Sequence, residues 1–249
     1  MVLVLAGTVD ARHIISELLA KGFDVIATTT TEYGGGLIEK HPNLEVLSEG
    51  LTKEQIVELI QNRHIEALID ATHPYAVNAT LNAREAAELT DIPYYRYERS
   101  RTSYQNVEVV SSYEEAVKVL NGKNQNILLT IGSNYSHLFA KLRLENRVYT
   151  RVLPTAKVIE KVSQAGFKPS EIIALQGPFS KTFNKAIYTA YNIDVIVTKD
   201  SGSAGGTLEK IEAALEENIK VILIDRPTHG NDVFNNDEKM INQILEDLK

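Results

Sequence analysis

The chain contains no cysteine and no tryptophan. Without cysteine it has no disulfide framework, no thiolate nucleophile and no zinc–thiolate site, and a reducing cytoplasm is the expected compartment. The apolar start, residues 1–6, is too short for a signal peptide and lacks a basic leader. No apolar run approaches a transmembrane span. We therefore expect a cytoplasmic protein that does not associate with membranes.

Positive charge is in the minority, with 26 Lys and Arg against 33 Asp and Glu and a net charge of −7. The basic residues are spread along the chain, which argues against nucleic-acid binding. An anionic small ligand would need local cations to overcome this background. The length of 249 residues, 43% of them apolar, suffices for one large or two small domains with packed cores.

Several catalytic motifs are missing: a Ser-His-Asp order, HExxH, a Walker loop and paired carboxylates in a defined motif. An activated nucleophile is therefore unsupported, and we expect no bound metal ion. A reaction in which a cofactor carries the difficult step fits better, because the protein then needs to bind, orient and provide a proton.

Short apolar runs alternate with helical patterns along the whole chain, as in sequential βα units, which require parallel strands and right-handed crossovers. The two halves share this architecture but no close sequence repeat. We predict an α/β fold of two Rossmann-like domains with mainly parallel sheets facing a central cleft. The expected domains are a dinucleotide-binding-like domain, 1–98, and a C-terminal α/β domain, 99–249, whose first part, 99–123, bridges the two.

The stretch Leu68–Ala76 changes from a buried strand to a helix. Pro74 is expected to open the helix, capped by Thr72 or His73. Polar side chains at the carboxyl end of a strand, facing a helix N-terminus, lie where open α/β sheets place their ligands. Capping and turning the chain would explain the same residues without a ligand.

The turn Gly7-Thr8 also lies between a strand and a helix, which suits a phosphate, although it is only a fragment of the three-glycine dinucleotide fingerprint. The second strand ends in Thr28–Thr31, where a dinucleotide fold meets the adenosine ribose. The hydroxyls suit either form of the coenzyme, and Glu32 weakly favours the unphosphorylated one. A plain βα turn and a β-branched strand end are the alternatives.

Six motifs stand in order along nearly the whole chain: Gly7-Thr-x-Asp-Ala-Arg12, Asp70-Ala-Thr-His-Pro-Tyr-Ala76, Arg96-Tyr-Glu-Arg99, Gln176-Gly-Pro-Phe-Ser180, Lys199-Asp-Ser-Gly202 with Gly205-Gly206, and Arg226-Pro227. Together they resemble the precorrin-6A reductases, including the cobalt-precorrin-6A reductases. The resemblance implies an NADPH- or NADH-dependent reduction of one macrocycle double bond in cobalamin biosynthesis. Hydride transfer would be followed by proton delivery to the neighbouring carbon.

On this resemblance, the residues expected to bind the coenzyme are Gly7, Thr8 and Arg12 at the phosphates, Thr29 and Thr30 towards the adenosine, and Gly205 and Gly206 at a close backbone approach. The cations expected to bind carboxylates of the tetrapyrrole substrate are Arg99, Arg151, Lys199 and Arg226. The aromatic side chains expected to pack on the ring are Tyr75, Tyr97 and Phe179. The other expected substrate-binding residues are Thr72, Ser133, Gln176, Gly177, Ser180, Asp200 and Ser201. His73 is the candidate catalytic proton donor, with solvent as the alternative.

Two other functions remain compatible with such a fold, because fold does not fix function. One is a nucleotide-sugar transferase, and the other is a non-catalytic binding protein for an anionic small molecule. A reductase must bind NADH or NADPH and lose affinity when Thr8 is replaced, whereas a carrier need bind neither. The metal content of the substrate and the oligomeric state stay open.

Overall fold

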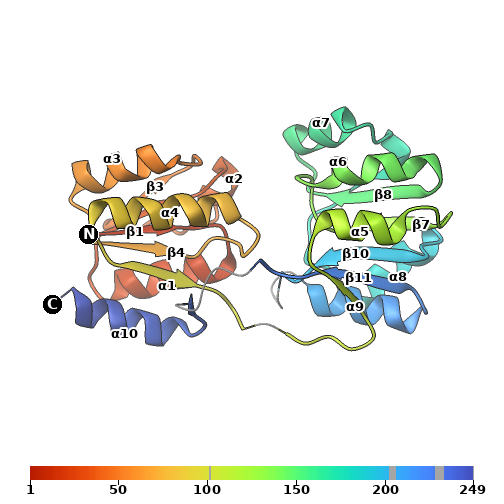
Figure 1. Ribbon diagram of the computed structural model, residues 1–249. Helices are drawn as coiled ribbons and strands as arrows, with labels where there is room; N and C mark the ends of the chain where they lie inside the picture. Colours follow the sequence, from red (N-terminus) through yellow and green to blue (C-terminus); the bar gives the residue numbers. More distant parts are fainter. Residues whose placement is uncertain (101, 202–205, 228–232, 249) are drawn as a thin grey trace. The chain divides into compact units, whose positions relative to one another are not determined.

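The structure, a computed structural model, describes residues 1–100, 102–201, 206–227 and 233–248. The chain divides into two compact units, one formed by residues 1–100 and 227–249 and the other by residues 101–226 (Figure 1). Each unit is built on a six-stranded sheet, and all strand pairs among the described residues are parallel. The predicted α/β class with two Rossmann-like units is confirmed.

The sheet of the first unit has the strand order β12-β5-β4-β1-β2-β3. Its strands are β1 (Val2–Leu5), β2 (Val25–Thr28), β3 (Leu44–Leu47), β4 (Ala67–Asp70), β5 (Tyr94–Tyr97) and β12 (Val233–Phe234). Its helices are α1 (Val9–Ala20), α2 (Glu32–Gly35), α3 (Lys53–Arg63), α4 (Val77–Thr90) and α10 (Asp237–Asp247). The continuous apolar runs of β1 and β4 are buried because α1 and α10 cover one face and α3 and α4 the other.

The sheet of the second unit has the order β6-β11-β10-β7-β8-β9. Its strands are β6 (Glu108–Val110), β7 (Asn126–Leu129), β8 (Arg147–Val152), β9 (Ile172–Ala174), β10 (Val195–Lys199) and β11 (Lys220–Ile224). Its helices are α5 (Tyr113–Leu120), α6 (Ser136–Phe139), α7 (Ala156–Gln164), α8 (Lys181–Ala190) and α9 (Thr207–Glu216), with 3-10 turns η1 (Ala140–Leu144) and η2 (Pro169–Glu171). Side chains of α8 and α9 form one core with the strands.

The two sheets exchange their edge strands. Strand β6 follows β5 in the chain but pairs with β11, and β12 follows β11 but pairs with β5. Helix α10 then buries Met240, Ile241 and Ile244 in the core of the first unit. The expected C-terminal domain 99–249 is corrected accordingly: 227–249 belongs to the first unit, and β6 and α5 belong to the second unit rather than to a bridge. The apolar spacing of α10 predicts a helix, but it does not specify which sheet the helix covers.

The predicted start of α4 is also wrong. The helix begins at Val77, and its N-cap residue Ala76 provides no side-chain hydrogen bond. Pro74 stays in the preceding turn, where the Ala76 amide donates to the His73 carbonyl at 2.7 Å. Thr72 does not cap the helix, because its hydroxyl donates to Asp70 and accepts from the Arg96 guanidinium.

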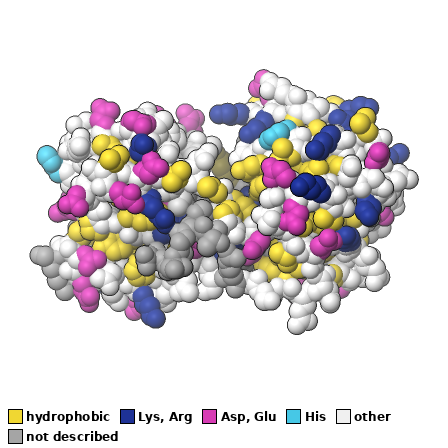
Figure 2. Space-filling view, in the orientation of Figure 1, with side chains coloured by type: hydrophobic (Ala, Val, Ile, Leu, Met, Phe, Trp, Pro, Cys, Tyr) yellow, Lys and Arg dark blue, Asp and Glu magenta, His cyan; other side chains and the backbone are white. Residues whose placement is uncertain are grey.

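Side chains of both charges occur over both units on the face shown in Figure 2. Among the residues that the structure describes, none of the helices has the length and apolar character needed to cross a membrane. Within the same residues no cluster of three or more His, Asp or Glu side chains is arranged to hold a metal ion.

Candidate functional site

A small cavity of about 210 Å³ lies at the carboxyl ends of β1 and β2 in the first unit. It brings together the five residues predicted in this unit for the coenzyme: Gly7, Thr8, Arg12, Thr29 and Thr30. Thr31, Tyr33 and Gly34 complete its polar side, and none of the described residues that line it is a carboxylate. The fold therefore gathers in one place five residues that come from two separate parts of the sequence.

The turn between β1 and α1 is held by Thr8. Its hydroxyl accepts a hydrogen bond from the Ala11 amide at 3.0 Å, as the N-cap of α1, and donates to the Ala71 carbonyl at 3.2 Å. Gly7 is exposed, and a Cβ atom added there would meet nothing nearer than the His73 amide nitrogen at 4.0 Å. The fold itself does not require glycine at this position, so the open space in front of the helix N-terminus is available to a ligand.

The threonines after β2 have different environments. Thr29 is 5% exposed and donates to the Thr31 carbonyl at 3.0 Å, whereas Thr30 is exposed. Thr31 is the N-cap of the single-turn helix α2 and accepts from the Gly34 amide. Thr30 is thus the threonine of this group whose hydroxyl most readily meets a ligand.

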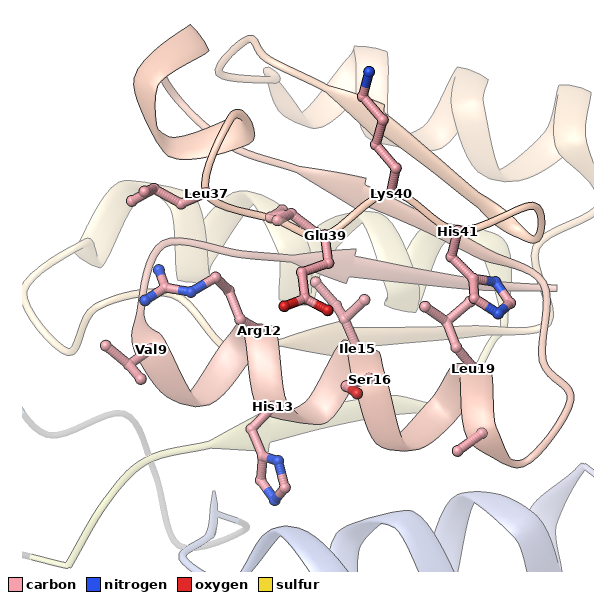
Figure 3. A pocket seen from close by; sticks show the side chains of 12 residues that line it. Val9, Arg12, His13, Ile15, Ser16, Leu19, Leu37, Glu39, Lys40 and His41 are labelled. Carbon is pink, nitrogen blue, oxygen red and sulfur yellow. The ribbon is translucent and has the colours of Figure 1, made fainter.

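Arg12 connects this cavity with a larger one of about 520 Å³, on the outer side of α1 (Figure 3). Figure 3 shows Arg12 on the side of α1 that faces Leu37 and Glu39, while His13 points away towards α10, where it lies 3.1 Å from the Asp237 carboxylate. Among the described residues, Arg12 has no ion-pair or hydrogen-bond partner for its guanidinium. It is available to an anion.

A buried charge network closes the carboxyl ends of β4 and β5. Arg96 is fully buried, and its guanidinium lies 2.7 Å from Asp70 and 2.8 Å from Glu98. Asp70 also accepts from the hydroxyls of Thr72 at 2.7 Å and Tyr94 at 3.0 Å. Burial, reinforced by the Asp70 charge, raises the pKa of Tyr94 well above its usual range. Asp70 and Thr72 therefore link the carboxyl ends of β4 and β5. The Thr72 hydroxyl is already hydrogen-bonded in this network, so the predicted substrate contact would have to use a hydroxyl that already has protein partners.

His73 and Tyr75 follow this network. The Nδ1 atom of His73 accepts from the Tyr75 amide at 3.3 Å, and the two rings are 5.6 Å apart. A neutral imidazole with this acceptor carries its proton on Nε2. Arg99 forms an ion pair with Asp10 at 2.5 Å, and Tyr97 is half-buried with a pKa raised by burial and by Asp10.

In the second unit, Arg151 at the end of β8 is 8% exposed. Its guanidinium donates to Asn184 Oδ1 at 2.8 Å and lies 4.8 Å from the centre of the Phe179 ring. Phe179 in turn stacks on Phe183 at 4.9 Å. Burial lowers the pKa of Arg151 from its ordinary value. The predicted contacts Arg151 and Phe179 are therefore direct neighbours.

The loop after β10 is tied to the end of β11. Arg226 Nε lies 2.8 Å from Asp200 Oδ2 and donates to the Asp200 carbonyl at 2.9 Å. The Ser201 amide donates to the Thr207 hydroxyl at the start of α9. Burial lowers the pKa of Lys199 to about 8. Asp200 and Arg226 are both nearly fully buried, so their pair stabilises the backbone directly after Lys199, the last residue of β10.

Four further predicted substrate contacts lie in exposed or half-buried loops of the second unit: Ser133, Gln176, Gly177 and Ser180. Ser180 is the N-cap of α8. Gly206 precedes α9 with a φ of +62°, which favours glycine, and a Cβ there would lie 3.5 Å from Pro178. Gly205 lies outside the described residues.

Lys210 is a residue that the sequence-based prediction missed. It lies in the first turn of α9 and is 6% exposed. The signal in the sequence was its spacing, because Thr207, Lys210 and Ala214 follow the helical period of one buried stripe.

A small cavity in front of a glycine turn and a helix N-terminus, in one of two parallel-sheet units, defines a two-unit α/β protein of the dinucleotide-binding type. The sequence model of the precorrin-6x reductase family CbiJ/CobK matches residues 1–245. The chain belongs to this family, as the motif resemblance predicted, and is an oxidoreductase of cobalamin biosynthesis.

Relatives support the assignment over the whole length. The cobalt-precorrin-6A reductase of Priestia megaterium is 40% identical over 91% of both chains, and that of Methanothermobacter thermautotrophicus is 40% identical over 100% of this chain and 84% of its own. The precorrin-6A reductase of Sinorhizobium sp is 28% identical over 90% and 84%. The solved structure of the CobK precorrin-6A reductase superposes with a TM-score of 0.80, at 22% identity, over 99% of this chain and 96% of its own, which supports the fold.

Proposed function

We propose that this protein reduces one carbon–carbon double bond of precorrin-6A, in its cobalt form, to the 6B level. The observation that carries this proposal is the family match over residues 1–245. The cobalt form is favoured because relatives at 31–40% identity are named cobalt-precorrin-6A reductases, whereas those named precorrin-6A reductases are 28% identical. A hydride adds to one carbon of the double bond and a proton to its neighbour, so the macrocycle gains two electrons.

The residues at the small cavity of the first unit fit a reduced nicotinamide coenzyme, which supplies the hydride when bound. Gly7 leaves the helix N-terminus open, so backbone amides at the start of α1 can donate to a pyrophosphate. Arg12 offers a charge to the same phosphates, and Thr30 offers a hydroxyl towards the adenosine end. Within the described part of the chain the lining contains a cation and no carboxylate, and it is compatible with both NADH and NADPH.

The second unit suits the acidic tetrapyrrole. Arg151 is held by Asn184 and presents its planar guanidinium beside Phe179. An arginine fixed in this way can bind a carboxylate through two parallel hydrogen bonds at little entropic cost. Lys199 adds a second positive charge at the carboxyl end of β10.

His73 is our candidate for the proton donor, with solvent as the alternative. Its Nδ1 atom is engaged with the Tyr75 amide, so Nε2 is the atom from which a proton would leave. His73→Gln should lower kcat with little change in the KM for the coenzyme if His73 donates the proton. An unchanged kcat over the pH range 6–8 would assign the proton to solvent.

The deciding experiment follows anaerobic oxidation of NADH and NADPH by absorbance, with cobalt-precorrin-6A and metal-free precorrin-6A offered in turn. Turnover with cobalt-precorrin-6A and one coenzyme supports the proposal. Turnover with the metal-free substrate alone would reject the cobalt form. If the folded protein binds the macrocycle but oxidises neither coenzyme, the reductase proposal fails and a carrier role is favoured.

A further inference from the structure

The larger cavity of the first unit, of about 520 Å³, lies beside α1 where the connection between β2 and β3 covers the sheet incompletely (Figure 3). The helix in this connection, α2, has a single turn, and residues 36–43 continue to β3 without helix. Connections between adjacent parallel strands usually contain a helix that packs on the sheet. Here Leu19 of α1 and Leu44 and Val46 of β3 therefore stay partly exposed, although they pack on the core.

The lining of the larger cavity is mainly apolar. Ile15 and Ile38 are buried side chains that line it, and Val9 and Leu37 are half-exposed. Pockets that bind small organic molecules have volumes of about 300–1,000 Å³ and apolar walls with a few polar groups. The larger cavity has both properties, so it can hold a ligand with an apolar body.

Three polar side chains give the larger cavity its specificity. Arg12 lies at one end, His41 lies at the other, and Glu39 points towards α1 between them, whereas Lys40 points away from α1 (Figure 3). The Nδ1 atom of His41 accepts from the Asn43 amide at 3.2 Å, so a neutral His41 offers an N–H donor at Nε2. Among the described residues, neither Arg12 nor Glu39 has an ion-pair partner.

The exposure of the two charged groups decides which sign of ligand is favoured. Arg12 is partly buried, whereas Glu39 is exposed and solvated. Because a charge that is less screened by water interacts more strongly with a counter-ion, the Arg12 guanidinium gains more from a ligand than the Glu39 carboxylate does. A planar guanidinium also binds carboxylates, sulfonates and phosphates through paired hydrogen bonds.

We propose that the larger cavity is a regulatory site for a small organic anion with an apolar body. The anionic group pairs with Arg12, and the apolar body packs on Ile15 and Leu19. Glu39 can accept a hydrogen bond from a hydroxyl or amino group of the ligand, which favours a ligand that carries such a donor.

Occupation of this site opposes coenzyme binding. Arg12, Leu37 and Ile38 line both the larger cavity and the smaller one. An anion in the larger cavity and the coenzyme phosphates in the smaller cavity would share one guanidinium and repel one another. This consequence rests on the proposed function, which places the coenzyme in the smaller cavity. Since coupling between two binding sites is reciprocal, the coenzyme must weaken binding of the anion by the same factor.

The test uses 8-anilinonaphthalene-1-sulfonate, which has an apolar body, an amino donor and an anionic group, titrated by fluorescence without coenzyme. Ser16→Trp places an indole in the larger cavity from an exposed position of α1 and should lower the probe affinity about tenfold or more. Arg12→Gln should also lower it about tenfold or more. Glu17→Trp is the matched control, because it adds the same side chain to the same helix outside the described lining, and it should change the affinity by less than about twofold.

Equal probe affinity in wild type, Ser16→Trp and Arg12→Gln would overturn the proposed site, with circular dichroism confirming that each variant is folded. Binding that Gly7→Val abolishes and Ser16→Trp preserves would place the probe in the smaller cavity and would overturn it as well.

Calorimetric titration of NADH and NADPH, with and without saturating probe, tests the coupling. The probe should lower coenzyme affinity by about fivefold or more, and an unchanged affinity would refute the regulatory role. A protein that binds the probe in an Arg12-dependent manner but binds neither coenzyme would refute the proposed coenzyme site and leave the anion site standing.

Discussion

Replacing Lys210 with methionine is expected to stabilise the ligand-free protein at pH 7. Methionine keeps the length and the apolar stem of lysine while removing the ammonium group, which has no ion-pair or hydrogen-bond partner within the described part of the chain. A residue retained for the fold alone would give the opposite result, because its replacement would lower stability.

The expected magnitude follows from the charge. The ordinary lysine pKa of 10.5 falls to about 7 in the folded protein, and at about 1.4 kcal/mol per pH unit this difference corresponds to roughly 5 kcal/mol. Rearrangement around a buried charge reduces such penalties, and apolar replacements of buried ions stabilise proteins by about 1–4 kcal/mol. We expect Lys210→Met to raise the free energy of unfolding by about 2–4 kcal/mol at pH 7.

The sign of the pH dependence is fixed by the lowered pKa of Lys210. Below pH 7 the lysine is protonated in both states, and the folded state carries the full penalty. Between about pH 7 and 10.5 the unfolded state binds more protons than the folded state, so wild-type stability rises with pH. The advantage of Lys210→Met should therefore shrink to about 1 kcal/mol or less at pH 10.

Urea unfolding of both proteins at pH 7 and pH 10, followed by circular dichroism and by fluorescence of the 11 tyrosines, measures this difference. Comparing variant with wild type cancels the titration of the other groups. Lys220→Met, at an exposed ion pair, should differ from wild type by about 1 kcal/mol or less. A destabilised Lys210→Met at pH 7, or an equal advantage at both pH values, would refute the reasoning.

Four other variants test the remaining contacts. Gly7→Val should weaken NADH and NADPH binding by more than about tenfold without loss of stability, since its Cβ meets only open space; an unchanged dissociation constant would remove Gly7 from the coenzyme site. Arg99→Ala should raise the KM for the tetrapyrrole if Arg99 binds a carboxylate, because about 1–3 kcal/mol of binding free energy is lost. An unchanged KM in steady-state kinetics would exclude Arg99 from the substrate site. Asp70→Ala should cost about 3–5 kcal/mol in urea unfolding because the buried Arg96 keeps only Glu98 as an ion-pair partner and the hydroxyls of Thr72 and Tyr94 lose their acceptor; a loss below 1 kcal/mol would contradict the pairing. Thr52→Ala removes a capping box and should cost about 1 kcal/mol, measured the same way, with no effect expected on coenzyme binding.

Local patterns in the sequence predicted the strands well because a strand buried on both faces must be continuously apolar. The run Val2–Leu5 and the turn Gly7-Thr8 illustrate this, since both lie as expected and the turn lines a cavity. The predictions that were wrong concerned features that depend on tertiary contacts. Pro74 is typical of a helix start. However, the Thr72 hydroxyl is hydrogen-bonded to Asp70, and the helix begins later, at Val77.

The site residues show the same limit. The proximity of Arg151 and Phe179 depends on how the ends of β8 and β9 pack against α8, which spacing along the chain does not encode. Lys210 was overlooked because a lysine in an amphipathic helix is ordinarily placed on the solvated face. Its helical spacing with the buried Ala214 was the contrary signal, and only the packed structure decides between the two.

The two sheets place the same buried pair at the same position. In the first sheet Asp70 ends β4 and binds Arg96 of the neighbouring strand β5, and in the second Asp200 follows β10 and binds Arg226 after the neighbouring strand β11. The two members of each pair bind one another. Each pair therefore stabilises the carboxyl ends of its strands in both units and does not distinguish the ligands of the two units.

The two units must then differ in their ligands because of the next strand but one in each sheet. This strand is β2, on the other side of β1 from β4, and β8, on the other side of β7 from β10. Strand β2 ends in neutral threonines beside a cavity, whereas the corresponding strand β8 ends in Arg151, close to Lys199 and Lys210. Neutral hydroxyls and a helix N-terminus suit a nucleotide, whose charge is local and fixed, whereas several converging cations suit a polycarboxylate. This difference between equivalent positions of two similar sheets favours coenzyme binding by the first unit and tetrapyrrole binding by the second.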